Sequence, residues 1–136
     1  FYMFVFYLLL ILSIFSCPLF PQANEPYDHN LEGKNLICFA NSKSIEDWGI
    51  KFLPNKSVIL YSLDKFIFEL YEYKRSYKSD ERNIKIYNGK EIDFLINRRT
   101  LRFANKKCSL TKYDPLFLLK DRIENLKKSK TKKNIL

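Results

Sequence analysis

The sequence predicts an all-β fold, a small antiparallel meander or barrel of seven or eight strands with one C-terminal amphipathic helix. Apolar and polar residues alternate along several short runs, turn-forming residues separate these runs, and a helical period appears only near the end of the chain. A sheet built in this way must bury one face. With no helix between its strands, it does so best by curling on itself.

The first half of the domain predicts four strands. Its runs are rich in β-branched and aromatic residues, and Pro54-Asn55-Lys56 and Asp64-Lys65 have the composition of turns. The predicted strands cover residues 35–40, 49–53, 57–63 and 66–73.

The second half shows the alternation of a half-buried strand most clearly. Asn88-Gly89 has the residues of a tight hairpin between two alternating runs, and Asn97-Arg98-Arg99 forms a polar break. The predicted strands are 83–87, 91–97 and 100–103, with a short one through 108–110. The positions expected to face the core are Ile84, Ile86, Ile92, Phe94, Ile96, Leu101 and Phe103.

A single amphipathic helix is predicted over residues 113–128. Asp114 can cap its first turn, and Pro115 suits the position that follows. The apolar residues on one face are Leu116, Leu119, Ile123 and Leu126. We expect the helix to lie against the barrel or over one of its mouths. Alternatively, its apolar stripe and lysines meet a membrane surface.

Residues 1–23 have the character of an export signal. The first twenty residues are uncharged and apolar, and Pro18 and Pro21 interrupt this run ahead of Ala23. A basic start and an initiator methionine are missing, so we expect the true N-terminus to lie upstream. An uncleaved membrane anchor is the alternative, because about 20 apolar residues can cross a bilayer. Cys17 is a further candidate, for lipidation.

Two cysteines remain outside this leader, Cys38 and Cys108, near opposite ends of a domain at residues 30–112. In an oxidising compartment they are most simply a disulfide, which contributes about 4 kcal/mol for a loop of this length by the chain-entropy relation. The alternative is two buried free thiols. We expect a periplasmic or secreted protein, or one anchored in the membrane through its N-terminal segment.

The net charge of +9 is concentrated toward the C-terminus, where residues 129–136 are predicted to be a disordered basic tail. Lysines there and at the end of the helix could instead contact an anionic surface, such as lipid headgroups or acidic envelope polymers. The candidates for this contact are Lys127, Lys128, Lys130, Lys132 and Lys133.

Aromatic and cationic residues interleave between Tyr71 and Lys78, and arginines gather near Arg98. Such a surface on a barrel can stack single-stranded nucleic acid, but the exported address argues for an acidic protein, glycan or lipid instead. The alternative is that tyrosine simply suits strands. The possible binding surface comprises Tyr71, Tyr73, Lys74, Arg75, Tyr77, Arg98, Arg99 and Arg102.

Aromatic residues are expected to fill the barrel. Trp48 is predicted to plug its core, the alternative being a stacking surface for a sugar or another ring. The phenylalanines supply enough bulk to argue against a large open cavity. Those expected in the core are Phe39, Phe52, Phe66, Phe68, Phe94 and Phe103.

Catalysis has little support in the sequence. His29 is the only histidine, so a zinc site with several imidazoles is impossible, and the three glycines form no phosphate-binding loop. If Cys38 and Cys108 are paired, no thiol nucleophile remains in the domain. We expect no metal, no cofactor and no enzymatic activity.

The segment from Tyr87 to Phe103, followed by Cys108, resembles the closing hairpin of small uncharacterised exported proteins of marine bacteria. In that family a leader precedes a Leu-x-Cys strand, here Leu36-Ile37-Cys38, and an Asn-Arg-x-Thr-Leu turn, here residues 97–101, precedes a closing cysteine. The resemblance implies an exported all-β domain with paired cysteines, and no known reaction or ligand. In architecture and cysteine placement, the chain is also similar to small β-barrel lysozyme inhibitors of bacterial envelopes.

These features predict an exported, non-catalytic binding or structural protein of the bacterial cell envelope, monomeric and without nucleic acid as a partner. The alternatives are a lipocalin-like carrier of a small apolar ligand and an envelope enzyme inhibitor. An apolar pocket above roughly 300 Å³ would favour the carrier. A filled barrel with an exposed basic or aromatic patch would favour a macromolecular partner.

Overall fold

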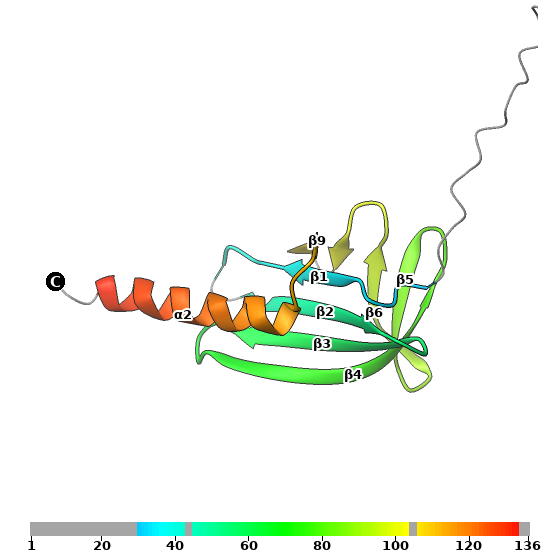
Figure 1. The fold of residues 1–136 in the computed structure, drawn as a ribbon, viewed down its shortest axis with the longest axis horizontal. Helices are drawn as coiled ribbons and strands as arrows, with labels where there is room; N and C mark the ends of the chain where they lie inside the picture. Colours follow the sequence, from blue (N-terminus) through cyan, green and yellow to red (C-terminus); the bar gives the residue numbers. More distant parts are fainter. Residues whose placement is uncertain (1–29, 43–44, 104–105, 134–136) are drawn as a thin grey trace, which may run out of the picture.

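The computed structural model describes residues 30–42, 45–103 and 106–133. These residues form nine strands in one antiparallel sheet and one helix (Figure 1). The elements are β1 (Asn35–Cys38), β2 (Asp47–Leu53), β3 (Ser57–Asp64), β4 (Glu69–Ser79), β5 (Asn83–Asn88), β6 (Glu91–Asn97), β7 (Arg102–Phe103), β8 (Lys106–Lys107), β9 (Ser109–Thr111) and α2 (Pro115–Lys133). The predicted fold class is confirmed, with one strand more than expected.

The sheet closes almost completely because one stretch of chain pairs at both of its edges. The strand order is β8-β7-β6-β5-β4-β3-β2-β1-β9. Only Cys108 separates β8 from β9, so residues 106–111 pair with β7 on one side and with β1 on the other. The result is a nearly closed barrel in which few strand edges are left unpaired.

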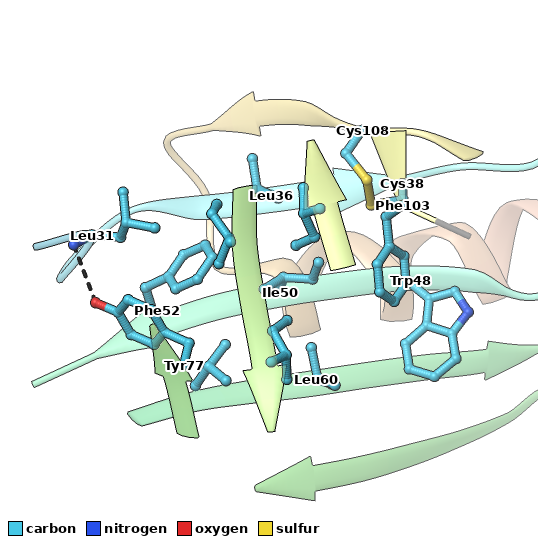
Figure 2. Packing of buried hydrophobic residues seen from close by; sticks show 14 residues of the cluster. Leu31, Leu36, Cys38, Trp48, Ile50, Phe52, Leu60, Tyr77, Phe103 and Cys108 are labelled. Carbon is cyan, nitrogen blue, oxygen red and sulfur yellow. Dashed lines mark hydrogen bonds between the residues drawn. A yellow bond between two sulfur atoms is a disulfide. The ribbon is translucent and has the colours of Figure 1, made fainter. Parts of the chain in front are cut away.

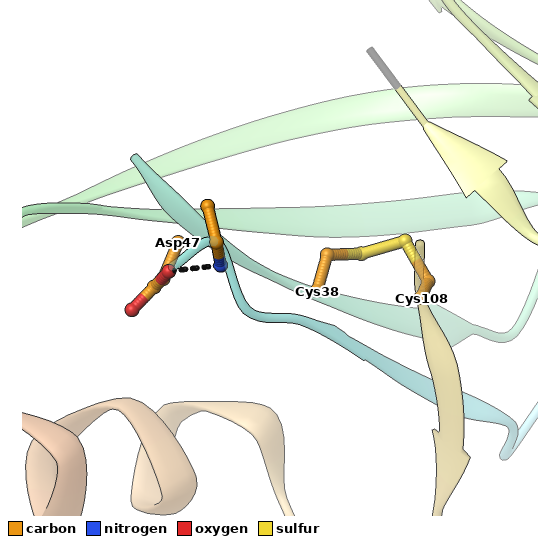
Figure 3. Close-up of a disulfide and its surroundings, with 4 residues drawn as sticks. Cys38, Asp47 and Cys108 are labelled. Carbon is orange, nitrogen blue, oxygen red and sulfur yellow. Dashed lines mark hydrogen bonds between the residues drawn. A yellow bond between two sulfur atoms is a disulfide. The ribbon is translucent and has the colours of Figure 1, made fainter. Parts of the chain in front are cut away.

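The predicted disulfide between Cys38 and Cys108 is present at this seam (Figure 3). The two residues continue the ladder between β1 and β9, in which Ile37 is paired with Ser109. Their Cα atoms are 4.1 Å apart, and both residues are buried. The bond therefore locks together two strands whose cysteines lie 70 positions apart in the sequence.

The interior of the barrel is filled by side chains (Figure 2). Trp48, Phe52, Tyr77 and Phe103 are the aromatic residues buried in this cluster. Trp48 packs edge-on against Phe94 and Phe103, with ring centroids 5.3 and 5.4 Å apart. Trp48 is therefore a core residue, as predicted.

A second apolar cluster holds α2 against the outer face of β1, β2 and β3. Leu119 is fully buried there with Ile37 and Leu63. Gly49 on β2 permits this approach, because a Cβ at that position would stand 2.6 Å from the Cβ of Pro115. The helix thus lies along the wall of the barrel rather than over a mouth.

The helix begins at Pro115, two residues after the predicted start at residue 113, and it ends later than predicted. Asp114 caps it, since the Leu116 N–H donates to its Oδ1 at 2.9 Å. It continues to Lys133, beyond the predicted end at residue 128, so residues 129–133 are helical rather than a disordered tail. Lysine is a good helix former, which explains how a charged segment extends the helix.

Several predicted strands are corrected. β1 ends at Cys38 rather than at residue 40, β2 begins at Asp47 rather than at residue 49, and β7 begins at Arg102 rather than at residue 100. β4 begins at Glu69 rather than at residue 66 and runs to Ser79, because residues 65–68 form a turn. Ile92 on β6 is exposed rather than in the core. The pairing of β5 with β6 shifts register between Ile86 and Tyr87, and such a bulge reverses the faces of the residues beyond it.

Candidate functional site

One end of the barrel reverses the usual order of burial. In the turn between β3 and β4, Lys65 is only 6% exposed, whereas the next two residues, Phe66 and Ile67, are 68% and 56% exposed. Lysine is rarely buried unless it is paired, and adjacent large apolar side chains exposed together often mark a contact surface. The prediction that Phe66 fills the core is wrong, because this turn directs Lys65 inward instead. Phe68, also expected in the core, is half-buried in the same turn and belongs to neither core cluster.

Lys65 is buried because it binds a fully buried carboxylate. Its Nζ lies 3.0 Å from Oδ1 of Asp47 and donates a 2.6 Å hydrogen bond to the Ala40 carbonyl. The Ala40 N–H donates to the same Oδ1 at 2.7 Å (Figure 3), and Nε of Arg122 on α2 lies 3.3 Å from Oδ2. One carboxylate therefore joins the loop between β1 and β2, the β3–β4 turn and the helix.

Cations of α2 lie over aromatic rings at the same end. Nζ of Lys127 and Nζ of Lys130 are 5.7 and 5.8 Å from the centroid of the Phe68 ring. The guanidinium of Arg122 is 5.2 Å from the centroid of Phe39, a second phenylalanine that is exposed rather than in the core. These distances fall within the range of cation–π attraction.

We call this surface the apolar-basic end. It consists of Phe39, Ile45, Phe66, Ile67, Phe68, Arg122, Lys127 and Lys130. In Figure 1 the β3–β4 turn and the last part of α2 lie toward the same end, and the helix continues past the sheet. Nearby, Nζ of Lys106 is 5.4 Å from the Trp48 ring centroid, and burial lowers the pKa of this lysine.

The predicted tyrosine-arginine surface is not assembled around β4. Tyr77 is buried, and its hydroxyl accepts a 3.1 Å hydrogen bond from the Leu31 N–H (Figure 2). Tyr73 is half-buried and stacks against Trp48, with ring centroids 6.2 Å apart. Arg75 is paired with Asp93 through a 3.1 Å contact between Nε and Oδ2. These side chains serve packing and pairing within the barrel.

The arginines of that predicted surface lie away from Tyr71. Nη1 of Arg98 donates to the carbonyl of Asp80, which follows the end of β4, whereas Tyr71 is near its beginning. About 30 Å of extended strand separates these positions. Arg99 and Arg102 are exposed beyond β6 and on β7. Of the remaining members, Lys74 is exposed on β4, as Tyr71 is.

The predicted anionic-surface lysines are placed on α2. The side chains of Lys127, Lys128, Lys130 and Lys132 are exposed. For Lys133 only the helical backbone is described. Cys17 and the predicted leader, residues 1–23, lie outside the described residues.

Two surface pockets lie away from the apolar-basic end. The larger, of about 410 Å³, is bordered by the turns after β2 and β5, and Lys56, Lys78 and Lys90 contribute to its lining; we call it the lysine pocket. The smaller, of about 130 Å³, is lined mainly by apolar residues such as Leu36 and Phe52.

Within residues 30–42, 45–103 and 106–133, no group of three or more His, Cys, Asp or Glu side chains is placed to hold a metal ion. In the same part of the chain, no helix combines the length and the apolar character needed to span a membrane. Comparison with protein-family models, with curated proteins and with solved structures finds no match to this chain.

Sequence reasoning missed Asp47 and Lys65, the pair on which this end is built. One signal was present: Phe66-Ile67-Phe68 is an unbroken apolar run, not an alternating one, directly after the turn residues Asp64-Lys65. The pairing itself joins positions 18 residues apart on either side of a hairpin, and no local pattern encodes it.

Proposed function

We propose that the protein is an exported, non-catalytic binding protein of the bacterial cell envelope, with an anionic partner. The observation that carries this proposal is the inverted burial at the β3–β4 turn, where Lys65 faces inward and Phe66 and Ile67 face water. Exposing two large apolar side chains beside cationic groups is a cost without benefit to an isolated domain. It is explained if this surface contacts a partner.

The filled interior supports a surface-binding role over the carriage of an apolar ligand. Trp48, Phe52 and Phe103 occupy the space that a lipocalin-like carrier would keep open. The lysine pocket is bordered by the turns after β2 and β5, and its lysines suit an anion better than an apolar molecule.

The disulfide supports the exported address. Disulfides persist in oxidising compartments, and this one is buried at the barrel seam, where it stabilises the closed form. The family resemblance of the closing hairpin points to the same address. Export and a surface partner together define the proposed role.

Intact mass tests the exported address on which the proposal depends. The full chain is expressed with an initiator methionine in a bacterial host, recovered from membrane and periplasmic fractions, and alkylated with and without prior reduction. We expect a mature protein beginning near Asn24, with the thiols of Cys38 and Cys108 alkylated only after reduction. Recovery from the cytosol, or thiols that react without reduction, would overturn the exported assignment.

A further inference from the structure

We infer that the apolar-basic end docks on the surface of a bilayer that contains anionic phospholipids, with Phe66 and Ile67 entering the boundary between headgroups and acyl chains. This inference rests on the proposed function and names its partner. Four features of this end support the inference. The apolar residues lie at the tip of a turn, hydrogen bonds hold that turn in place, cations of α2 flank it, and apolar and basic groups occur together on one surface.

The exposed apolar residues sit at the tip of a hairpin. Phe66 and Ile67 are adjacent in the β3–β4 turn. Phe39 and Ile45, each 44% exposed, lie in the connection between β1 and β2. A tip of this kind can enter the interfacial region of a bilayer without any rearrangement of the barrel. Amphipathic surfaces bound to membranes bury their apolar groups roughly 5–10 Å into the headgroup boundary, a depth that a turn can reach.

The turn is held in this presentation before any contact is made. Oδ1 of Asp64 accepts hydrogen bonds from the N–H groups of Phe66 and Ile67, at 2.9 and 3.4 Å. Lys65 is tied to Asp47 inside the barrel, and Phe68 is held at a φ of 55°, which bulky residues rarely adopt. Because the tip is already ordered, docking costs little conformational entropy.

Cations flank the tip on the side of α2. Lys127 and Lys130 lie over the Phe68 ring, next to the exposed pair. From Lys127 to Lys132 the helix carries four lysines and no acidic residue. Anionic lipid surfaces attract such basic segments within about one Debye length, and lysines and apolar groups then act together.

A bilayer accounts for both halves of this surface. An acidic glycan would satisfy the lysines but would leave Phe66 and Ile67 in water. A nucleic-acid strand could stack a base on Phe66 but would offer no apolar environment to Ile67. A bilayer places phosphates directly above an apolar layer, so a tip flanked by lysines meets both at once. The observations therefore favour lipid over a soluble polyanion.

The test places a tryptophan at the tip and measures its depth. The Phe66→Trp protein, recovered from the exporting host with its disulfide intact, is mixed with vesicles of phosphatidylcholine containing roughly one third phosphatidylglycerol and brominated acyl chains. We expect bromine quenching beyond that of the parent, whose only tryptophan, Trp48, is buried. Phe117→Trp is the matched control, because Phe117 is a comparably exposed phenylalanine near the start of α2.

This readout is local, so it reports on the tip even if another segment also holds the protein on the vesicle. Lys127→Gln/Lys130→Gln in the Phe66→Trp background should weaken the apparent partition by about fivefold per lysine. Lys128→Gln/Lys132→Gln, with the same charge change on another face of the helix, should weaken it less.

Three outcomes would overturn the inference: no quenching beyond the parent, equal quenching in Phe117→Trp, or equal loss in the two lysine pairs. If quenching is absent and the protein binds dextran sulfate, the partner is a soluble polyanion instead. None of these results bears on export, which the intact-mass experiment decides separately.

Discussion

The two ends of strand β1 satisfy a buried backbone donor in different ways. Before β1, the Leu31 N–H donates to the hydroxyl of Tyr77, a neutral group. After β1, the Ala40 N–H donates to the carboxylate of Asp47, which also binds two cationic side chains. A buried hydroxyl needs only its hydrogen bonds, whereas a buried carboxylate is stable only when cations neutralise it.

The charged arrangement occurs at the end where Phe66 and Ile67 are exposed side by side, whereas Leu110 is exposed at the Leu31 end. Lys65 cannot turn outward without leaving Asp47 short of a cation, so the turn stays in the form that keeps Phe66 and Ile67 in water. The Tyr77 end also carries lysines, around the lysine pocket, but there a tyrosine and Leu31 close the core. The buried charges therefore hold the turn in the form that exposes Phe66 and Ile67.

Breaking the disulfide should have the largest effect on stability. Cys38→Ser/Cys108→Ser frees the seam and should lower the free energy of unfolding by about 4 kcal/mol, because a long loop is no longer closed in the unfolded chain. Urea denaturation of the parent, with and without reductant, should give the same difference. A loss of stability below about 1 kcal/mol would mean that strand pairing alone holds the seam between β1 and β9 closed.

Neutralising the buried carboxylate of Asp47 should have the second-largest effect on stability. Asp47→Asn keeps the shape of the side chain but leaves Lys65 buried without an anionic partner, and we expect a loss of about 3 kcal/mol by urea denaturation. Asp93→Asn is the matched control. It breaks the ion pair with Arg75, which is more exposed, and should cost at most about 1 kcal/mol. Equal losses would remove the special role given to Asp47.

Removing the hydroxyl at the opposite end should cost less. Tyr77→Phe leaves the Leu31 N–H without this acceptor and should lower the free energy of unfolding by about 1 kcal/mol. Trp48 fluorescence should be unchanged, because the phenyl ring at position 77 still fills the core. If the loss matched that of Asp47→Asn, charge would not be what distinguishes the two ends.

The sequence predicted the barrel because its alternation is local and its turns have characteristic residues. Ile84, Ile86 and Phe103 are buried as predicted, and Asp114 caps the helix. Ile92 is exposed because a register shift depends on how two strands meet, which the pattern of one strand does not contain.

The candidate site was harder to predict than the fold. Apolar residues are assigned to the core by default, so Phe39 and Phe66 were expected inside, and a lysine in a turn was expected outside. The actual arrangement follows from one carboxylate, Asp47, that draws Lys65 inward. The lysines of α2 were identified from their charge, but their position beside Phe68 depends on how the helix packs.

The helix is also joined to the barrel by an exposed ion pair near its start, and this pair should have the smallest effect. Nζ of Lys51 lies 2.9 Å from Oδ2 of Asp114, and both side chains are partly exposed. The hydrogen bond from Lys51 lowers the pKa of Asp114, and the same bond raises the pKa of Lys51.

A carboxyl group whose pKa is lowered by folding contributes stability above its unfolded pKa, about 4, and this contribution disappears as the pH falls through the folded pKa. Asp114→Asn can still cap the helix but has no proton to take up. Its urea midpoint should therefore fall less than that of the parent below about pH 4, and the difference should shrink at high salt. If the urea midpoints of the two proteins fall in parallel with pH, the pair between Lys51 and Asp114 adds nothing to stability. Asp47 would then be the carboxylate that fixes the helix to the barrel.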